Sequence, residues 1–307
     1  RANPALLLLA CILYFVEVYL RGLRWSYLLR PLRHVQTNRL FPIMIMGYMS
    51  NNLLPMRAGE LVRAWLVGTR AGVSRSAALA TIAIERVFDG ITMLLALVAV
   101  MPFLPVPDWL WVTAGLGAAA FAAGLAFCVA LVWRGEAAVQ VLHRALFFLP
   151  SGLRSRTAQL FAYFLEGLQV LRQRREVLVA LGLSLVVWPM AATNYYIISQ
   201  SIGLDIPWWG LLLVVCVIAL VSSIPSAPGY LGTFELSAMA TMGLPGLAVP
   251  ATLAATMTLL VRSVLFFPVI FVGLAVLWQS KWTLGAVFDE AKNVRKSPTA
   301  TSSQSSS

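Results

Sequence analysis

Three charged residues at regular intervals open the most polar part of an otherwise apolar chain, residues 51–90. Arg57, Glu60 and Arg63 are spaced by three, so one face of a helix would carry all three side chains. Guanidinium groups suit bidentate contact with a phosphate. The carboxylate could balance them, bind a cationic headgroup or carry a proton. The pattern therefore predicts a site for a charged, phosphate-bearing group.

A second charged group lies inside the next apolar segment, where Glu85, Arg86 and Asp89 occur within five residues. Ionisable side chains in a membrane-spanning segment are costly, and their default interpretation is a functional site. An alternative stays open, in which Arg86 with Asp89, or Arg63 with Glu60, forms an ion pair that only holds the fold together. Glu17 and Arg21, four residues apart, are interpreted as such a structural pair.

Helix-breaking residues accompany these charges in two places along the chain. In each place the break is followed by an acid and later by an arginine inside an apolar run, Glu60 and Arg86 first and Glu235 and Arg262 second. Proline and glycine interrupt helices and can leave backbone groups unpaired. The predicted breaks lie at Asn51, Asn52, Pro55 and Gly59 in the first place and at Pro225, Pro228, Gly229 and Gly232 in the second.

The composition identifies an integral membrane protein. Of 307 residues, 60% are hydrophobic and 11% charged, with a mean hydropathy of +0.82, whereas soluble domains carry about 25% charged residues. The net charge of +11 comes from basic residues in the short connections between apolar runs. Membrane topology explains basic residues at these places, so the charge does not indicate a nucleic-acid partner. Cys11, Cys128 and Cys216 lie in apolar runs and are interpreted as buried apolar side chains.

Long apolar runs predict helices rather than strands. Basic residues at the end of the first run, among them Arg21, Arg24 and Arg30, place that end in the cytoplasm. The C-terminus is placed on the same side by Lys281, Lys292, Arg295 and Lys296. A basic linker precedes residue 177 and contains either two amphipathic segments, 139–149 and 160–171, or no ordered structure. The predicted helices are 4–29, 40–54, 58–67, 77–101, 109–133, 177–204, 206–234 (interrupted), 236–242 and 250–278.

The order of these elements predicts an all-α, polytopic helical bundle of two inverted repeats, each with a broken, re-entrant helix pair. Repeat one covers about 4–101, a connecting span and linker 109–176, and repeat two 177–279, within a membrane domain of residues 1–280. Residues 281–307 form a basic, then Ser/Thr-rich, disordered tail. Broken helices in corresponding positions of two halves indicate a transport site. Ordinary kinks at proline and glycine are the alternative.

Four sequence segments carry a resemblance to a known family: YLRGLRWSYLLRPL, NNLLPMRAGELVRAWLVG, GVSRSAALATIAIERVFDG and SIPSAPGYLGTFE. With them the chain resembles the lysylphosphatidylglycerol synthase transmembrane, or flippase-like, family from Asn3 to about Trp278. The resemblance implies a cavity between two inverted halves through which a lipid crosses. It points to Arg57, Glu60, Arg63, Glu85, Arg86, Asp89, Glu235 and Arg262, together with Pro228, Gly229 and Gly232. The best understood members join this region to a cytosolic aminoacyl transferase domain, and members usually have one more N-terminal span. This sequence departs from both features, so it is similar to the stand-alone members.

These observations predict a flippase or scramblase for a phospholipid or polyprenyl-phosphate lipid in a bacterial or archaeal cytoplasmic membrane. The alternative is a membrane-embedded transferase, or its accessory subunit, that acts on a lipid-linked sugar or an aminoacyl lipid. His34 and His143 have no second ligand at a metal spacing, and no nucleotide-binding or nucleophile motif occurs. No catalytic residue, metal or cofactor is therefore expected. A separate synthase and a second copy of the chain are the other expected partners.

Overall fold

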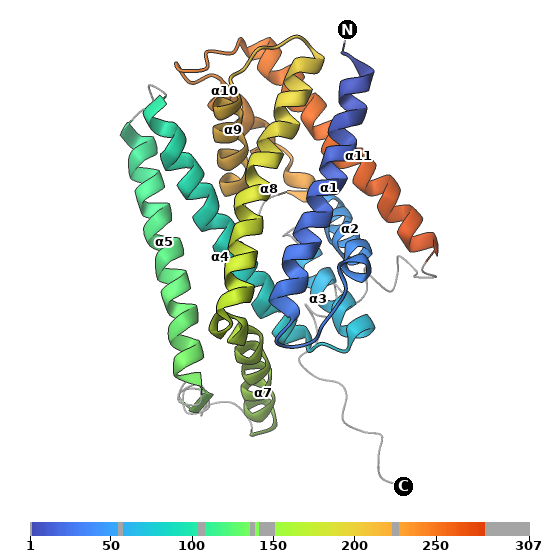
Figure 1. Cartoon of the computed structure of the whole chain (residues 1–307), viewed down its shortest axis with the longest axis vertical. Helices are drawn as coiled ribbons and strands as arrows, with labels where there is room; N and C mark the ends of the chain where they lie inside the picture. The colour runs from blue at the N-terminus through green and yellow to red at the C-terminus, as the bar shows by residue number, and fades with distance from the viewer. Residues whose placement is uncertain are drawn as a thin grey trace.

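The computed structural model describes residues 2–54, 58–103, 108–135, 139–140, 151–222 and 227–279, and these residues form ten α-helices and no strand. The helices form one bundle that combines long and short members (Figure 1). The predicted all-α class is confirmed for this part of the chain. The predicted helix breaks Pro55 and Pro225, the predicted site residue Arg57 and the C-terminal tail lie outside the described residues.

Long helices run through much of the height of the bundle (Figure 1). Four of them contain segments that are long and apolar enough to cross a membrane: α1 (Pro4–Leu29), α5 (Asp108–Trp133), α8 (Arg174–Ser201) and α11 (Ala251–Gln279). The prediction of their positions from apolar runs is confirmed to within three residues at each end. A fifth long helix, α4 (Arg75–Val100), has the same length as α1 but carries three charged residues at its centre.

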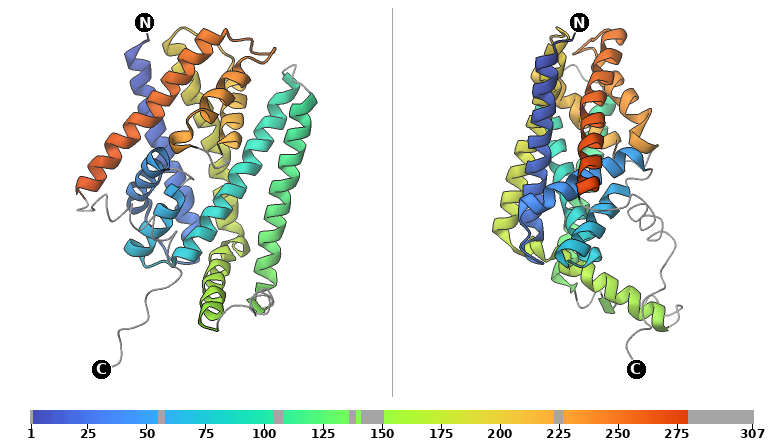
Figure 2. Two further views of the ribbon diagram at one scale, coloured as in Figure 1. Left: turned by 180° about the vertical axis from the view of Figure 1, so that it is seen from behind. Right: turned by 90° about the vertical axis from the view of Figure 1, so that its right-hand side faces the viewer.

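Short helices come in two pairs, each confined to one half of the bundle. The first pair is α2 (Thr37–Leu53) and α3 (Ala58–Ala71), and the second is α9 (Trp208–Val221) and α10 (Thr233–Met242). Figures 1 and 2 place α2 and α3 in the lower half and α9 and α10 in the upper half, so that both pairs end near mid-height. A short 3-10 turn, η3 (Pro228–Tyr230), precedes α10 and packs against α2. Both predicted interruptions are therefore real breaks between helices.

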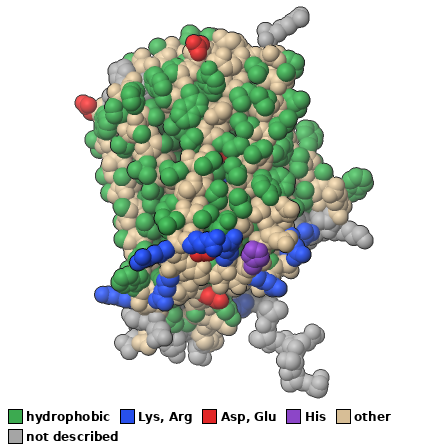
Figure 3. All heavy atoms as spheres, viewed as in Figure 1, with side chains coloured by type: hydrophobic (Ala, Val, Ile, Leu, Met, Phe, Trp, Pro, Cys, Tyr) green, Lys and Arg blue, Asp and Glu red, His purple; other side chains and the backbone are tan. Residues whose placement is uncertain are grey.

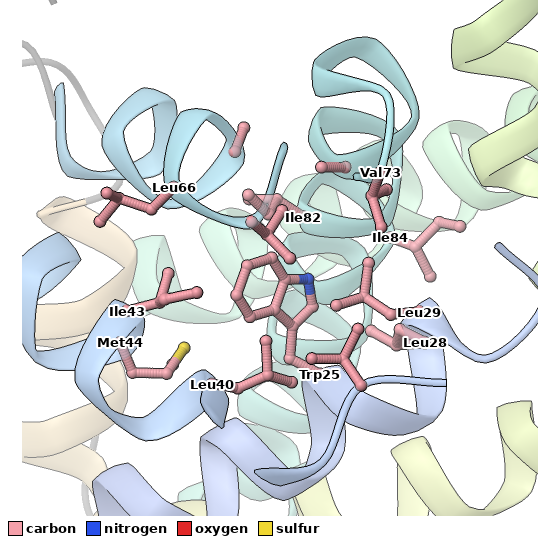
Figure 4. Close-up of a cluster of buried hydrophobic side chains, with 14 of the residues drawn as sticks. Trp25, Leu28, Leu29, Leu40, Ile43, Met44, Leu66, Val73, Ile82 and Ile84 are labelled. Atoms are coloured by element: carbon pink, nitrogen blue, oxygen red, sulfur yellow. The ribbon is translucent and has the colours of Figure 1, made fainter. Parts of the chain in front are cut away.

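Two separate hydrophobic clusters hold the bundle together. One is built mainly from α8–α11 and the upper part of α4, and the other mainly from α1–α4. Figure 4 shows the second cluster around Trp25, with apolar side chains from all four of the first helices. The Trp25 indole also donates a hydrogen bond to Thr81 Oγ1 over 3.1 Å, so this buried polar group is satisfied. Each half of the chain thus has its own core.

Charge is distributed unevenly over the surface. Figure 3 shows a largely apolar face above a band of Lys and Arg side chains near its lower end. At the opposite end, Asp108 and Asp205 are exposed where α5 begins and α8 has ended. An apolar belt with a basic rim at one end is the surface expected of a membrane-spanning bundle. The exposed arginines at helix ends on the basic side are Arg33, Arg39, Arg70, Arg75, Arg134, Arg172, Arg174 and Arg175.

A helix that sequence analysis placed only in part, α7 (Ser151–Leu168), lies at the basic end and extends sideways there (Figure 2, right). It continues into the 3-10 turn η2 (Gln169–Arg172) and packs against α4. The predicted amphipathic segment 160–171 is therefore helical, and the alternative of an unstructured linker is wrong for residues 151–172. Of the other segment, 139–149, only residues 139–140 are described.

Candidate functional site: a charged cavity inside the bundle

A cavity of about 260 Å³ lies inside the bundle and takes its walls from both halves of the chain. Its lining comes from α1, α2, α3 and α4 in the first half and from α8, α9, η3, α10 and α11 in the second. Both short helix pairs contribute residues near their broken ends, including Asn51 and Asn52 from α2 and Gly229 from η3. The elements that interrupt the apolar pattern thus meet at one place.

Arg24 is the centre of the ionic network behind the cavity wall. Its side chain is completely buried and contacts both Asp89 and Glu85, the latter at 3.0 Å. Its Nη1 also donates to Ser184 Oγ on α8 at 2.6 Å. The assignment of Arg24 to the cytoplasmic basic end is therefore wrong: this arginine neutralises two acids of α4 in the interior. A buried arginine needs such partners, because its charge cannot be removed by deprotonation.

Arg63 forms the second buried link in the first half. It donates from Nη2 to Glu85 Oε2 at 2.8 Å, and its guanidinium lies 4.4 Å from the centre of the Trp25 ring. The proposed pair of Arg63 with Glu60 is replaced by this contact. Arg63 on α3, Glu85 on α4 and Arg24 on α1 therefore connect three helices through one carboxylate. The network fixes how α3 meets α1 and α4.

Arg86 is the arginine of the network whose side chain is most exposed at the cavity. Its Nη2 lies 2.6 Å from Glu85 and 3.4 Å from Asp89, and its Nε lies 3.8 Å from Glu60. The Arg86 side chain nevertheless keeps 31% of its surface exposed. The predicted Arg86–Asp89 pair is thus present, but it does not bury Arg86. This guanidinium can reach a ligand while its carboxylate partners stay in place.

In the second half, Arg262 and Glu235 form an ion pair at the break between α9 and α10. Arg262 also donates to the carbonyl oxygen of Gly229 at 2.9 Å, and Glu235 accepts a hydrogen bond from the backbone N–H of Gly232 at 2.7 Å. Gly229 and Gly232 have φ of 62° and 84°, a region that favours glycine. The two glycines therefore allow the backbone of the turn before α10. The Arg262–Glu235 ion pair links this turn to α11.

The ends of the two short helix pairs touch each other. A Cβ added to Gly229 would lie 3.2 Å from the carbonyl oxygen of Asn52. On the other side of the first break, Asn51 accepts a hydrogen bond from the backbone N–H of Gly59 at 2.8 Å. Asn51 thereby satisfies one of the free N–H groups at the start of α3. The broken ends are held in contact beside the cavity.

The Glu17–Arg21 pair belongs to the cavity wall. The pair is confirmed, with Arg21 donating to Glu17 at 3.0 and 2.8 Å, and the Arg21 guanidinium lies 4.9 Å from the centre of the Trp188 ring. Both residues line the cavity, so the pair is more than structural, and the placement of Arg21 at the cytoplasmic basic end is wrong, as it is for Arg24. Glu17, Arg21 and Arg24 share one face of an otherwise apolar helix. This spacing could have indicated from the sequence that Arg24 also points into the bundle.

The predicted site residues separate into three sets. Those that line the cavity are Glu60, Arg63, Arg86, Arg262, Asn51, Asn52 and Gly229. Glu85 and Asp89 lie behind the wall with exposures of 0% and 1%, and Glu235 lies behind Arg262. Gly59, Pro228 and Gly232 mark the breaks without lining the cavity, whereas Arg57, Pro55 and Pro225 are outside the described residues. Within the described ranges, no cluster of His, Cys, Asp and Glu has the makings of a metal site.

Comparison with known proteins relates the chain to two archaeal proteins. It is similar to a UPF0104 membrane protein of Methanothermobacter thermautotrophicus, 27% identical over 252 residues that cover 76% of this chain and 74% of the relative. It is also similar to the glycosyltransferase AglD of Haloferax volcanii, 26% identical over 266 residues. That match covers 77% of this chain but only 43% of AglD. No solved structure matches the chain.

A family model for the lysylphosphatidylglycerol synthase TM region matches residues 1–273. The match includes both helix breaks, all the arginines and acids of the ionic network, and every element that lines the cavity. The four sequence segments that carried the resemblance all lie within it. The chain is therefore a member of the lysylphosphatidylglycerol synthase TM region family.

Proposed function

We propose that this protein moves a phosphate-bearing lipid from one membrane leaflet to the other. The observation that carries the proposal is a charged cavity inside a bundle whose outer surface is apolar. An amphipathic lipid needs such a combination, because its headgroup requires polar surroundings at mid-membrane while its tails can stay in the bilayer. Membership of a family named for a lipid synthase's membrane region supports a lipid substrate.

In this proposal the fold is an inverted repeat. Repeat one comprises α1–α4 and repeat two α8–α11, with α5 and α7 between them, and each short pair is a re-entrant hairpin. The confinement of α2 and α3 to one half of the bundle, and of α9 and α10 to the other, supports this arrangement. Half-helix ends bring unpaired backbone groups and partial charges to mid-membrane, where an alternating-access transporter binds its substrate.

Arg86 and Arg262 are the proposed phosphate contacts. Their side chains retain 31% and 18% exposure, whereas Arg24 and Arg63 are buried at 0% and 3%. Arg86 comes from the first half and Arg262 from the second, so one phosphate held between them would connect the two repeats. Glu85 and Asp89 would orient Arg86 from behind without touching the lipid.

The proposed location is a bacterial or archaeal cytoplasmic membrane, with the basic end of the bundle and the C-terminus in the cytoplasm. The band of exposed arginines at that end supports the orientation, since basic residues accumulate on the cytoplasmic side of membrane proteins.

Replacing the second-half arginine should slow headgroup transit while leaving the fold intact. In proteoliposomes with fluorescent phosphatidylglycerol, we expect Arg262→Gln to reduce the protein-dependent transit rate about tenfold, because it removes a charge-assisted contact with phosphate. The Glu235 carboxylate is 25% exposed and still accepts the hydrogen bond from the backbone N–H of Gly232. The variant therefore does not leave a buried carboxylate without a partner. The matched control is Arg39→Gln, which removes an exposed arginine from the start of α2 and should keep the wild-type rate.

Transit at the wild-type rate by well-folded Arg262→Gln would rule out the role of this arginine. Absence of protein-dependent transit for every phosphate-bearing lipid tested, including a polyprenyl-phosphohexose, would reject the translocase itself.

A second candidate function is participation in sugar transfer, as a transferase or its accessory subunit. The observation that favours it is the similarity to a protein named glycosyltransferase AglD. The two functions predict different results when purified protein is incubated with a polyprenyl-phosphohexose and an acceptor lipid. The translocase predicts that no new glycolipid forms, and product formed by the protein alone would favour the transferase.

A further inference from the structure

The cavity wall holds polar atoms that have no partner within the described residues. Besides the Nε atoms of Arg63 and Arg86, four belong to uncharged side chains that line the cavity: the hydroxyls of Tyr48 and Ser222, the indole N–H of Trp188 and the amide oxygen of Asn194. Trp188, Asn194 and Ser222 are 6%, 1% and 7% exposed, so these residues are buried within the protein. A buried polar atom without a partner is costly, and a ligand that supplies the missing hydrogen bond recovers that energy.

The orientation of Asn194 follows from its neighbour. Its Nδ2 donates to the carbonyl oxygen of Ala10 at 2.9 Å. Since a carbonyl oxygen can only accept, the amide nitrogen must face Ala10, and Oδ1 is the atom left over. The four atoms are therefore one donor (the Trp188 indole), one acceptor (Asn194 Oδ1) and two hydroxyls that can do either.

The helices that carry these four atoms differ from the helices that carry the charged side chains of the cavity. The four atoms come from α2, α8 and the end of α9, whereas the charged lining residues come from α1, α3, α4 and α11. The two sets adjoin where the Arg21 guanidinium lies 4.9 Å from the centre of the Trp188 ring. Residues 188, 191 and 195 show that one face of α8 lines the cavity. The cavity thus offers charge on one set of helices and neutral hydrogen-bonding groups on another.

We propose that the neutral groups bind the hydroxyls of an uncharged polyol that is attached to the lipid phosphate. A hydroxyl both donates and accepts, so it can satisfy Trp188 and Asn194 at once, whereas an ammonium group only donates and leaves the indole unpaired. An ammonium would also meet arginines, because Glu17 already accepts two hydrogen bonds from Arg21 and Glu60 faces Arg86. The proposal rests on the proposed function and specifies the substrate class of the same cavity.

Two kinds of lipid have this headgroup chemistry: phosphatidylglycerol, with a glycerol, and a polyprenyl-phosphohexose, with a sugar. The probes for the purified protein are these two lipids, phosphatidic acid (phosphate alone) and phosphatidylethanolamine (phosphate with an ammonium). Dissociation constants come from the rise of the melting temperature with lipid concentration. We expect at least one polyol lipid to bind about tenfold more tightly than phosphatidic acid and phosphatidylethanolamine. Whichever of the two polyol lipids binds more tightly shows whether the preferred headgroup is a glycerol or a sugar.

The test variant is Tyr48→Phe/Ser222→Ala, which removes two cavity oxygens and no hydrogen bond recorded within the described residues. Without lipid it should melt at or above the wild-type temperature, and its affinity for the polyol lipid should fall toward that for phosphatidic acid, because two of the four neutral groups are lost. The matched control, Tyr19→Phe/Ser26→Ala, removes hydroxyls that have partners, Asn38 Oδ1 and the Leu23 carbonyl. It should melt at a lower temperature and keep the wild-type preference.

Equal binding of phosphatidic acid and the polyol lipids by the wild type, or an unchanged preference in the test variant, would overturn this proposal and leave the translocase standing. Binding of none of the four lipids would overturn both.

Discussion

Arg24→Met should yield little or no folded protein. Arg24 is completely buried between Asp89 and Glu85, so methionine would remove the fully buried one of the two arginines, Arg24 and Arg86, that contact both acids. Removing one partner from a buried ionic network costs about 3–5 kcal/mol, a large part of the stability of most proteins. We expect Arg24→Met to lose the symmetric gel-filtration peak of the wild type, and its melting temperature to fall steeply if any peak remains.

The control for this prediction is Arg30→Met, six positions further along the chain. Arg30 lies 3.7 Å from Glu176 but is 29% exposed, and such pairs contribute about 0–1 kcal/mol. A second variant, Arg24→Met/Asp89→Leu, removes the Asp89 carboxylate together with the arginine and should recover part of the lost stability. Wild-type yield and melting temperature in Arg24→Met would show that the network does not hold α1 to α4.

Gly59→Ala should separate α2 from α3 and stop transit. A Cβ at residue 59 would lie 1.9 Å from the carbonyl oxygen of Gly47 and 2.6 Å from Asn51 Oδ1. The first of these is backbone, so one helix must move away from the other. Such overpacking costs about 3 kcal/mol, and the shift would also break the Asn51 hydrogen bond to the start of α3. Melting temperature and proteoliposome transit should both fall sharply.

The matched control is Gly182→Ala in α8, where an added Cβ meets nothing within 4 Å. Because alanine favours a helix over glycine, this variant should be neutral or more stable by about 0.5–1 kcal/mol. If Gly59→Ala instead kept the stability and transit of Gly182→Ala, the close contact between α2 and α3 would have no role in either.

Much of the fold could be predicted because the apolar runs are long. Helices α1, α5, α8 and α11 follow directly from them, and proline and glycine located both breaks. The third helix was predicted one turn too short, since Gly68, Thr69 and Arg70 resemble a loop but continue α3. Local sequence could not show that Gly68 packs against Arg75 at the start of α4.

The candidate site was harder to predict because its contacts are long-range. Sequence analysis found Arg86 and Arg262 from their place inside apolar runs, but it assigned Arg24 to the basic rim. The partner of Arg24, Asp89, is 65 residues away, and no pattern within one helix reveals such a pairing. Arg86 faces the cavity, whereas its neighbour Glu85 lies behind the wall. This difference also depends on how α4 is rotated against α1 and α3, which the sequence does not show.

The position of three charges at the centre of α4 has a consequence for biogenesis. On insertion scales each charged residue near mid-membrane costs about 2.5–3.5 kcal/mol, so the translocon would hardly release α4 into lipid by itself. Its counter-charges, Arg24 and Arg63, precede it in the chain and are synthesised first. Helix α4 should therefore enter the bilayer only as a partner of α1 and α3, which makes the order of translation part of how this protein assembles.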